Sequence, residues 1–354
     1  MAQGAPEPRD GFATGAQDLR ARAAAAESHA RALCEAAASD LAIPEAVRLD
    51  ERTRTRLFLA LDHIVSAIEA SLLRGVAPLG FPGIGPTMPV LHAGGLAAEP
   101  ALIAELLACV QLEHLAAGLP HHAPDSPSRP SFLNRLADHP GSPIAEAARA
   151  LQLADSRARS PDAGRWRLPL TLHARLLWLV ASAMREQAGT LAGTALDEAL
   201  CAAVRAEIAH AERAAEDQVE AAAMRLVTAL DPTPRELGRL LVEVLRDRHL
   251  PMLLALLARA AAVDMVDIRA LLLDAGAERL LLLLHTLAVP REIIAELCLT
   301  LCNADPRRDL AALADAIDSL DRVDPSLGRD LLAQLRLAPE YRTARAALGA
   351  GRRR

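Results

Sequence analysis

The region from Thr233 to Ser319 constrains the fold most, because short amphipathic segments recur there with turn signals between them. The first segment has apolar residues at i, i+3, i+4, i+7 and i+8 and charged residues on the opposite face, which is typical of a helix that packs on one side. A turn, Asp247-Arg248-His249, and a leucine-rich run follow it, so we expect a helical hairpin. The apolar stripe consists of Leu237, Leu240, Leu241, Val244 and Leu245.

The hairpin pattern recurs twice more along the chain. Leu245, Leu273 and Leu301 close the first helix of each pair and lie roughly 28 residues apart, a spacing typical of stacked helical-hairpin solenoids. The sequence therefore predicts three stacked hairpins. The expected helices are 268–274 and 280–287 in the second hairpin, and 293–301 and 310–317 in the third.

Composition favours an all-α protein. The 354 residues can bury a sizeable core, and at roughly 150 residues per domain they allow two or three domains or one elongated array. Four Phe, two Trp and one Tyr leave little for aromatic-rich strands or for stacking on bases. The net charge is −6, with both signs interspersed, which argues against nucleic acid or an anionic membrane as a partner.

The cysteines and the hydrophobic runs favour a cytoplasmic protein. Five scattered cysteines do not form a disulfide framework, and the N-terminus has no basic region followed by an apolar one. The most hydrophobic run, from Leu280 to Val289, is interrupted by His285 and falls short of the ~20 apolar residues that span a bilayer. We expect this run to be a buried helix.

Changes in composition predict five parts along the chain. Within the N-terminal part, Asp50 is expected to cap a helix whose apolar stripe runs from Leu57 to Leu72 and which Gly75 ends. A polar, proline-containing stretch separates this part from the hairpins. The predicted parts are a disordered N-terminus (1–18), an N-terminal helical subdomain (19–155), a linker (156–170), a HEAT-like repeat domain (171–348) and a tail (349–354).

The Gly/Pro-rich stretch 75–89 resembles a phosphate-binding loop only superficially. A phosphate cradle needs converging backbone N–H groups, which prolines lack, and no Lys-Ser or Lys-Thr pair follows. We expect a connector here and assign no cofactor.

Two groups of residues raise the question of a metal. Glu207 and His210 share one helical face, as in di-iron carboxylate bundles, but no second copy of the motif is present. His114, His121 and His122 cluster loosely, with no cysteine at ligand spacing. The sequence assigns no metal ligand, and it leaves open whether either group binds a metal.

No arrangement of residues predicts a catalytic site. No Ser/His/Asp or Cys/His set has a recognisable local setting, such as a nucleophile elbow between a strand and a helix. Cys298 and Cys302 lie one helical turn apart on an apolar face, which is typical of small buried hydrophobes. The sequence therefore favours a protein that is not an enzyme.

Two turns carry the candidate partner contacts. In the segment 305–309, Asp305 is expected to cap the following helix. Arg307 and Arg308 in the same segment are candidates for contact with an acidic partner. Arg248 and His249, in the turn of the first hairpin, are further candidate contacts.

Several local motifs resemble those of one protein family. They are Ala222-Ala223-Met224-Arg225-Leu226 followed by Leu230-Asp231, the run Leu271-Leu272-Leu273-Asp274, Ala304-Asp305-Pro306-Arg307-Arg308-Asp309, and Pro339-Glu340-Tyr341-Arg342. From about Arg48 onward the chain is similar to uncharacterised bacterial proteins described as a domain of unknown function with HEAT-like hairpins. The resemblance implies a bacterial origin and a helical fold, and it carries over no catalytic or binding residues.

These observations predict a non-enzymatic function. Stacked hairpins bury a continuous core and leave one extended face free, which is the usual basis for holding another protein. We expect a non-enzymatic protein–protein interaction or regulatory scaffold module whose partner is another protein. The alternative is an enzyme, or a small-molecule or metal sensor, with a site between the N-terminal subdomain and the repeat array. A deep pocket lined by convergent polar groups favours the alternative.

Overall fold

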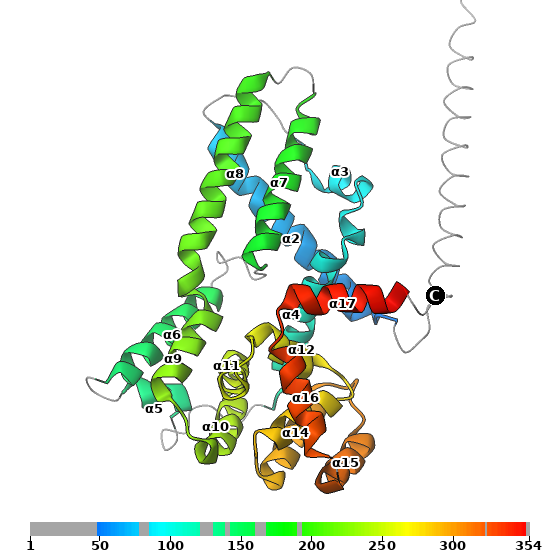
Figure 1. The fold of residues 1–354 in the computed structure, drawn as a ribbon. Coiled ribbons are helices and arrows are strands. Elements are labelled where there is room, and N and C mark those ends of the chain that lie inside the picture. Colours follow the sequence, from blue (N-terminus) through cyan, green and yellow to red (C-terminus); the bar gives the residue numbers. More distant parts are fainter. Residues whose placement is uncertain are drawn as a thin grey trace, which may run out of the picture. The chain divides into compact units, whose positions relative to one another are not determined.

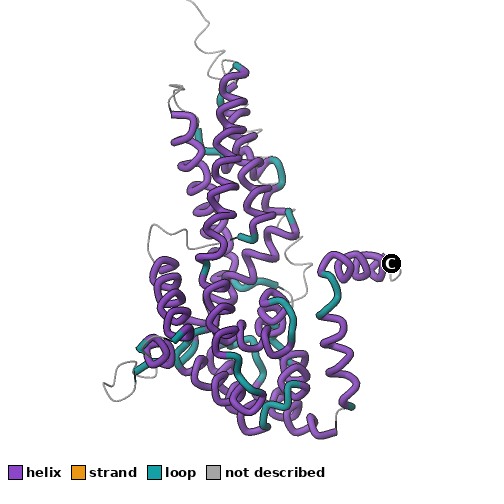
Figure 2. The backbone as a smooth tube through the Cα atoms, turned by 60° about the vertical axis from the view of Figure 1, so that its left-hand side comes forward, coloured by secondary structure: helices purple, strands orange, loops and turns teal. Residues whose placement is uncertain are grey.

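The computed structural model shows an all-α protein, as predicted. Every regular element in the part of the chain that the structure describes is a helix (Figure 2). Packing divides the chain into two units, Met1–Arg54 and Thr55–Arg354. The predictions for residues 1–18, His121 and His122 lie outside the described residues. The described ranges are 48–77, 85–120, 130–138, 142–159, 168–189, 193–322 and 324–351.

The helices fall into two consecutive groups along the chain (Figure 1). The first group comprises α2 (Glu51–Val76), α3 (Met88–Ala93), α4 (Pro100–Gly118), α5 (Phe132–Ala137), α6 (Pro143–Arg159), α7 (Leu170–Gln187), α8 (Thr194–Ala214) and α9 (Val219–Leu230). The second comprises α10 (Pro234–Arg246), α11 (Leu250–Ala261), α12 (Met265–Leu273), α13 (Glu278–Thr286), α14 (Arg291–Ala304), α15 (Leu310–Ser319), α16 (Pro325–Leu335) and α17 (Pro339–Gly351). Short 3-10 turns are Leu96–Ala98, Ala215–Asp217 and Leu320–Arg322.

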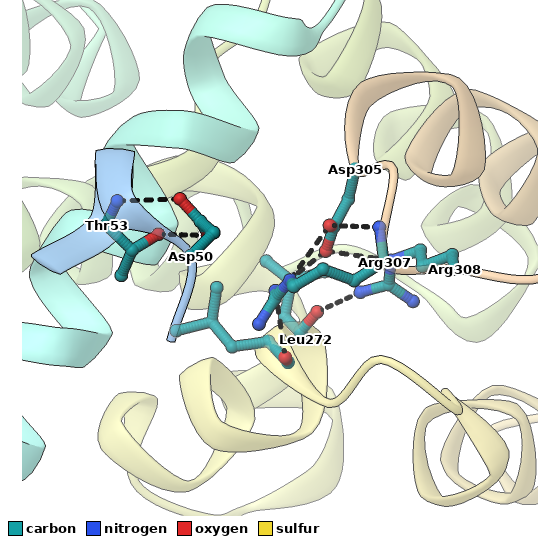
Figure 3. Close-up of polar contacts among 7 residues, drawn as sticks. Asp50, Thr53, Leu272, Asp305, Arg307 and Arg308 are labelled. Atoms are coloured by element: carbon teal, nitrogen blue, oxygen red, sulfur yellow. Dashed lines mark hydrogen bonds and ion pairs between the residues drawn. The ribbon is translucent and has the colours of Figure 1, made fainter. Parts of the chain in front are cut away.

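The first unit is described over residues 48–54, where α2 begins. The carboxylate of Asp50 accepts hydrogen bonds from the backbone N–H of Thr53 at 2.8 Å and from its hydroxyl at 2.7 Å (Figure 3). Because the first N–H groups of a helix have no intrahelical partner, this contact stabilises the helix start. The predicted cap at Asp50 is confirmed.

Helix α2 buries its predicted stripe but does not end at Gly75. The helix runs to Val76, and a Cβ on Gly75 would lie only 2.7 Å from the Cβ of Ala203 on α8. Glycine therefore serves here as a close-packing residue rather than as a helix stop. The buried stripe consists of Leu57, Leu61, Ile64, Val65, Ile68 and Leu72.

Helix α10 shows how the repeat region forms locally. Its start has a capping box, in which the carboxylate of Glu236 accepts from the backbone N–H of Thr233 at 3.0 Å. All five residues of the predicted apolar stripe are buried, from Leu237 to Leu245. The stripe packs against α11, so the first predicted hairpin is present.

The hairpins do not simply follow one another in sequence order. Helix α10 also packs against α14, where the position of a Cβ on Gly238 would lie 3.4 Å from Pro290 and 3.5 Å from Ile293. Helix α12 packs instead against α11 and α4. Gly238 therefore lies at van der Waals distance from the start of α14, so helices from non-consecutive hairpins are in direct contact.

Helices from both sides of the predicted linker 156–170 share one core. Helix α6 extends to Arg159 and packs along α9, while α4 packs against α12 and α14. At the end of α4, a Cβ on Gly118 would collide with the carbonyl oxygen of Ala304, so the two backbones are in direct contact. The predicted boundaries at 155 and 171 therefore do not coincide with a break in packing.

Helix α7 is less buried than its composition suggests. Its sequence is apolar nearly all round, which favours burial between layers. In the structure Leu176, Leu177 and Val180 are buried, but Trp178 and Leu179 are each 38% exposed. The helix packs against α8 and α3, and these two apolar side chains remain partly exposed.

Helix α4, rather than the run from Leu280 to Val289, is the described helix long and apolar enough to cross a membrane. It carries Glu105, which forms a two-pronged ion pair with Arg269 of α12 at 2.6 Å and 2.8 Å. Both side chains are mostly buried. Helix α4 therefore contributes polar as well as apolar contacts to the packing of this unit.

Candidate functional site

The turn between α14 and α15 is closed by its own charged residues (Figure 3). The carboxylate of Asp305 accepts from the backbone N–H of Arg307 at 3.1 Å, and from its side chain at 2.9 Å and 2.7 Å. Arg308 approaches the same carboxylate at 3.6 Å, and its side chain is only 1% exposed. One buried carboxylate thus forms ion pairs with two guanidinium groups.

Both arginines also reach the C-terminal end of α12. Arg308 donates a hydrogen bond to the carbonyl of Leu272, and Arg307 donates to that of Leu273 at 3.4 Å (Figure 3). The last carbonyls of a helix have no intrahelical donors and carry partial negative charge, so cations stabilise them. The two arginines therefore cap α12 from another part of the chain.

This arrangement corrects two expectations. Helix α15 is capped by Asp309, which accepts from Ala311 at 2.8 Å and Ala312 at 3.2 Å, and not by Asp305, whose carboxylate is occupied by the arginines. Arg308 has almost no exposed surface and so cannot meet a partner in this structure. Arg307 keeps 38% of its side chain exposed while holding Asp305.

Electrostatics supports a structural role for this turn. Burial alone would raise the pKa of Asp305, but hydrogen bonds and charge from Arg307, together with the charge of Arg308, hold it below its usual value. Burial lowers the pKa of Arg308, and Asp305 opposes that shift. Nearby on α14, burial raises the pKa of the Cys298 thiol to about 12, as expected for a small buried hydrophobe.

Arg248, in the turn between α10 and α11, caps a helix in a similar way. Its guanidinium donates to the carbonyl of Ala116, near the end of α4, at 2.6 Å. Arg336 does the same at the end of α11, where it donates to the carbonyl of Ala261 at 2.8 Å. Arg248 is therefore engaged inside the chain while half-buried, and its contact with a partner stays a prediction.

His249 has a local role as well as an unusual environment. Its Nδ1 accepts a hydrogen bond from the backbone N–H of Met252 at 3.3 Å, so the imidazole is the N-cap of α11. In a neutral imidazole whose Nδ1 accepts, the proton is on Nε2. Nε2 is buried without a hydrogen-bond partner, and the nearest carboxylate oxygen, on Asp155, lies 3.9 Å away.

Burial lowers the pKa of His249, while the neighbouring charge of Asp155 works in the opposite direction. The net direction is downward, so the neutral form dominates at pH 7. The Nδ1 contact and the pKa therefore agree on a neutral ring that offers an N–H at Nε2.

A pocket of about 210 Å³ adjoins His249. Its walls come from the start of α5, the second half of α6, α10 and the turn that follows α10. Its polar residues are Ser131, Asn134, Gln152, Asp155, Arg159, Asp247 and His249, and its apolar residues are Phe132, Leu133, Val244 and Met252.

Hydrogen bonds fix the polar walls of this pocket. The backbone N–H of Phe132 donates to Asp247 at 2.5 Å, which joins α5 to the α10–α11 turn. Arg159 donates to Asp155 one helical turn earlier on α6. The amide nitrogen of Gln152 donates to Asn134 at 2.8 Å. The arrangement offers both donors and acceptors to whatever enters the pocket.

Sequence reasoning selected His249 but missed the rest of this pocket. Asp155 and Arg159 are an i,i+4 pair, yet they fall at the predicted end of the N-terminal subdomain and inside the predicted linker. The i,i+4 spacing was therefore the one signal available. No local pattern indicates that α5 and α6 lie beside residue 247, because that contact spans about a hundred residues of sequence.

Of the two candidate metal groups, only Glu207, His210 and His114 lie in the part of the chain that the structure describes. Glu207 accepts a hydrogen bond from the hydroxyl of Ser71 on α2, and His210 is exposed on α8. Within the described ranges, no three His, Cys, Asp or Glu side chains come together in a way that would hold a metal ion. His114 lies on α4, and the structure does not describe His121 and His122.

Comparison with known proteins adds no assignment to this geometry. No family model, curated protein or solved structure matches the chain. The pocket beside His249 is therefore interpreted from its own residues.

Proposed function

We propose that this chain is a non-enzymatic recognition module, a protein–protein interaction or regulatory scaffold, which holds a segment of a partner protein at the pocket beside His249. The observation that carries the proposal is the pocket itself. It gathers polar side chains from α5, α6 and the α10–α11 turn, and three of its residues, Asn134, Arg159 and Asp247, are exposed to solvent. The partner's segment meets a preformed set of donors and acceptors there.

The chemistry of the pocket supports binding more than catalysis. A general base must present an unprotonated atom to the proton that it removes. The Nδ1 lone pair of His249 is already used by the backbone N–H of Met252, and Nε2 carries the proton. Asp155 and Asp247 each accept a hydrogen bond within the chain. These groups suit recognition of a polar segment.

The size of the pocket also supports recognition of a partner's segment. Sites for drug-sized ligands typically enclose roughly 300–1,000 Å³. At about 210 Å³, the pocket suits one side chain of a partner better than a whole cofactor. The remainder of the partner would lie on the surrounding surface of α5 and α6.

The repeat architecture and the family resemblance belong to this proposal. Leu245, Leu273 and Leu301, near the ends of the first helices, are all buried, which supports a common HEAT-like unit. The contact of α10 with α14 departs from a simple stack. We therefore propose that the three hairpins are HEAT-like units arranged around that contact, in a protein related to the bacterial family whose motifs this chain resembles.

A cytoplasmic location is also proposed. Four cysteines in the described part of the chain, Cys109, Cys201, Cys298 and Cys302, are free thiols. Thiols persist in compartments that glutathione and thioredoxin keep reducing. Location of a fluorescent fusion, compared with reporters for the periplasm and cytoplasm of a bacterial host, tests this proposal.

A small-molecule sensor is the second candidate function, and one observation favours it. The pocket lies between helices of the predicted N-terminal subdomain, α5 and α6, and helices of the predicted repeat domain, α10 and α11. A ligand there would contact both groups of helices at once. Such a ligand would raise the melting temperature of the protein without any partner.

A blocked pocket tests the main proposal. A displayed random-peptide library is selected on the immobilised full chain, and the enriched peptides are measured against an Asn134→Trp variant. We expect the bulky side chain at the exposed edge to weaken binding at least tenfold. A Thr228→Trp variant, with the same side chain on an exposed position of α9 outside the pocket, should bind as well as the unmodified protein.

Two results would contradict the main proposal. Peptides that bind the Asn134→Trp variant as tightly as the unmodified chain would place recognition elsewhere. A library that yields no binder, together with a metabolite that raises the melting temperature of the unmodified chain but not of Asn134→Trp, would favour the sensor.

A further inference from the structure

The pocket beside His249 carries an excess of negative charge. Two carboxylates line it, Asp155 from α6 and Asp247 from the α10–α11 turn, against the single guanidinium of Arg159. His249 adds no charge while its Nδ1 accepts from Met252. The net formal charge of the lining is therefore −1, and it becomes −2 when Arg159 turns away.

The chain itself shows that a guanidinium fits against Asp155. Arg159 donates to this carboxylate, and its side chain is 76% exposed, whereas that of Asp155 is 23% exposed. An i,i+4 ion pair whose cation is mostly exposed adds little to stability, because water already solvates that cation. A second cation that arrives from outside can replace Arg159 on Asp155 at small cost.

The neighbouring surface suits the rest of such a side chain. Leu133, Val244 and Met252 line the same pocket as the two carboxylates. Lysine and arginine place their aliphatic stems on apolar surface while their charged ends stay with polar groups. Gln152 uses its amide nitrogen on Asn134, so its carbonyl oxygen adds an acceptor for a cationic donor.

We infer that the pocket beside His249 receives a lysine or arginine side chain of the partner protein, with its charged end on the carboxylates of Asp155 and Asp247 and its stem along the apolar wall. This inference rests on the proposed recognition function and specifies the chemistry of the segment recognised. The buried Asp305 carboxylate differs, because both arginines of its own turn already occupy it.

Two probes of equal shape test the charge preference on the full chain. N-acetyl-L-arginine amide carries the guanidinium, and N-acetyl-L-citrulline amide replaces it with an uncharged urea. The readout is the methyl NMR spectrum of selectively labelled protein, in which Leu133, Val244 and Met252 report on the pocket. We expect the arginine probe to shift these methyl signals at a concentration at least tenfold lower than the citrulline probe.

Variants assign the preference to the carboxylates. Asp155→Asn, which retains shape at a residue whose ion pair is exposed, should remove most of the difference between the probes. Adding Asp247→Asn to Asp155→Asn should reduce the difference between the two probes further. Asp318→Asn, on α15 and outside the pocket, removes the same charge and should leave the preference unchanged.

Equal shifts with both probes would overturn the inference, as would an arginine preference that survives in the double variant. Failure of the charge preference is distinguishable from failure of the proposed recognition function. Library peptides that bind at the pocket without needing a lysine or arginine would refute the charge preference and leave recognition intact. Peptides whose binding drops at least tenfold when their lysine or arginine is replaced by citrulline or norleucine would support it.

Discussion

The turns at 247–249 and 305–309 are built from similar residues but have different consequences. Each follows the first helix of a hairpin and contains an aspartate followed by an arginine that caps a distant helix end. Arg248 donates to the carbonyl of Ala116, and Arg308 donates to that of Leu272. The difference lies in the aspartates, because Asp305 is enclosed by the arginines of its own turn, whereas Asp247 accepts from the backbone of α5.

The comparison indicates which polar turns serve only as structural contacts and which contribute to a binding pocket. When acid and base of one turn pair with each other, the side chains become buried and present little surface to a partner, as at Arg308. At the other turn the acid bonds to the start of a neighbouring helix instead, and a pocket lies beside that contact. Four predictions test this contrast.

The largest effect is expected from Arg308→Leu, which opens the closed turn. The change leaves the mostly buried Asp305 with one guanidinium and the carbonyl of Leu272 without its donor, so we expect a loss of about 3 kcal/mol. Urea unfolding at pH 7, followed by circular dichroism, measures it. Arg307→Leu, at a side chain 38% exposed, should cost about 1 kcal/mol. Equal costs for the two variants would refute the enclosed role of Arg308.

The next largest effect is expected at Gly118, which lies near the contacts of both turns. Gly118→Ala places a methyl group against the carbonyl of Ala304, which precedes the closed turn, and shifts the end of α4 that receives Arg248. We expect a loss of about 2 kcal/mol from overpacking, measured as a lower urea midpoint. Gly94→Ala, where the nearest atoms lie at 3.4 Å, should change stability by no more than about 0.5 kcal/mol. Unchanged stability of Gly118→Ala would contradict the backbone contact.

A smaller effect tests the role of His249 as the N-cap of α11. His249→Ala removes the N-cap of α11 and should cost about 1 kcal/mol. His249→Asn restores a side-chain acceptor for the N–H of Met252, so its stability should stay within about 0.5 kcal/mol of the unmodified chain. Thermal unfolding of the three proteins at pH 7 checks this order. An asparagine variant as unstable as the alanine variant would exclude the capping role.

The smallest effect is a dependence of stability on pH. Because folding lowers the pKa of His249 below 6.5, the unfolded chain takes up the proton first as the pH falls. Stability is therefore complete above pH 6.5 and decreases as the pH falls toward the pKa of the folded state. Burial lowers the pKa of His173 too, so His249→Asn should reduce this slope rather than abolish it. Free energies of unfolding between pH 7.5 and pH 5 measure the slope, and an identical slope in the variant would contradict the buried, neutral imidazole.

Local features of the fold were predictable from sequence. The 3.6-residue period placed Leu237 to Leu245 on one face, and all five stripe residues are buried, because amphipathicity alone decides which face of a helix packs. The cap at Asp50 was also predictable, because its acceptor and donors lie within three residues of each other. Such predictions need no knowledge of distant neighbours.

The assignment of Asp305 shows where local chemistry becomes ambiguous. Asp305 and Asp309 both stand before a possible helix start, and both are good N-caps. The arginines between them decide the outcome, because they capture Asp305 and leave Asp309 to cap α15. That choice depends on the carbonyls of α12, about thirty residues earlier in the chain.

The candidate site was predictable only at His249. Its other charged residues meet through the packing of α6 beside α9 and through the bond from Phe132 to Asp247, and no periodicity encodes which helices pack together. The close approach at Gly118 permits one such contact, that of α4 with α14, yet a glycine within a helical pattern is equally typical of a helix end.

The affinity of one library-selected peptide for the unmodified chain and for Asn134→Trp, measured by calorimetry at pH 7, tests recognition at the His249 pocket most directly. We predict a dissociation constant at least ten times larger for the variant, with a Thr228→Trp protein indistinguishable from the unmodified chain. Equal dissociation constants for the unmodified chain and Asn134→Trp would contradict the account.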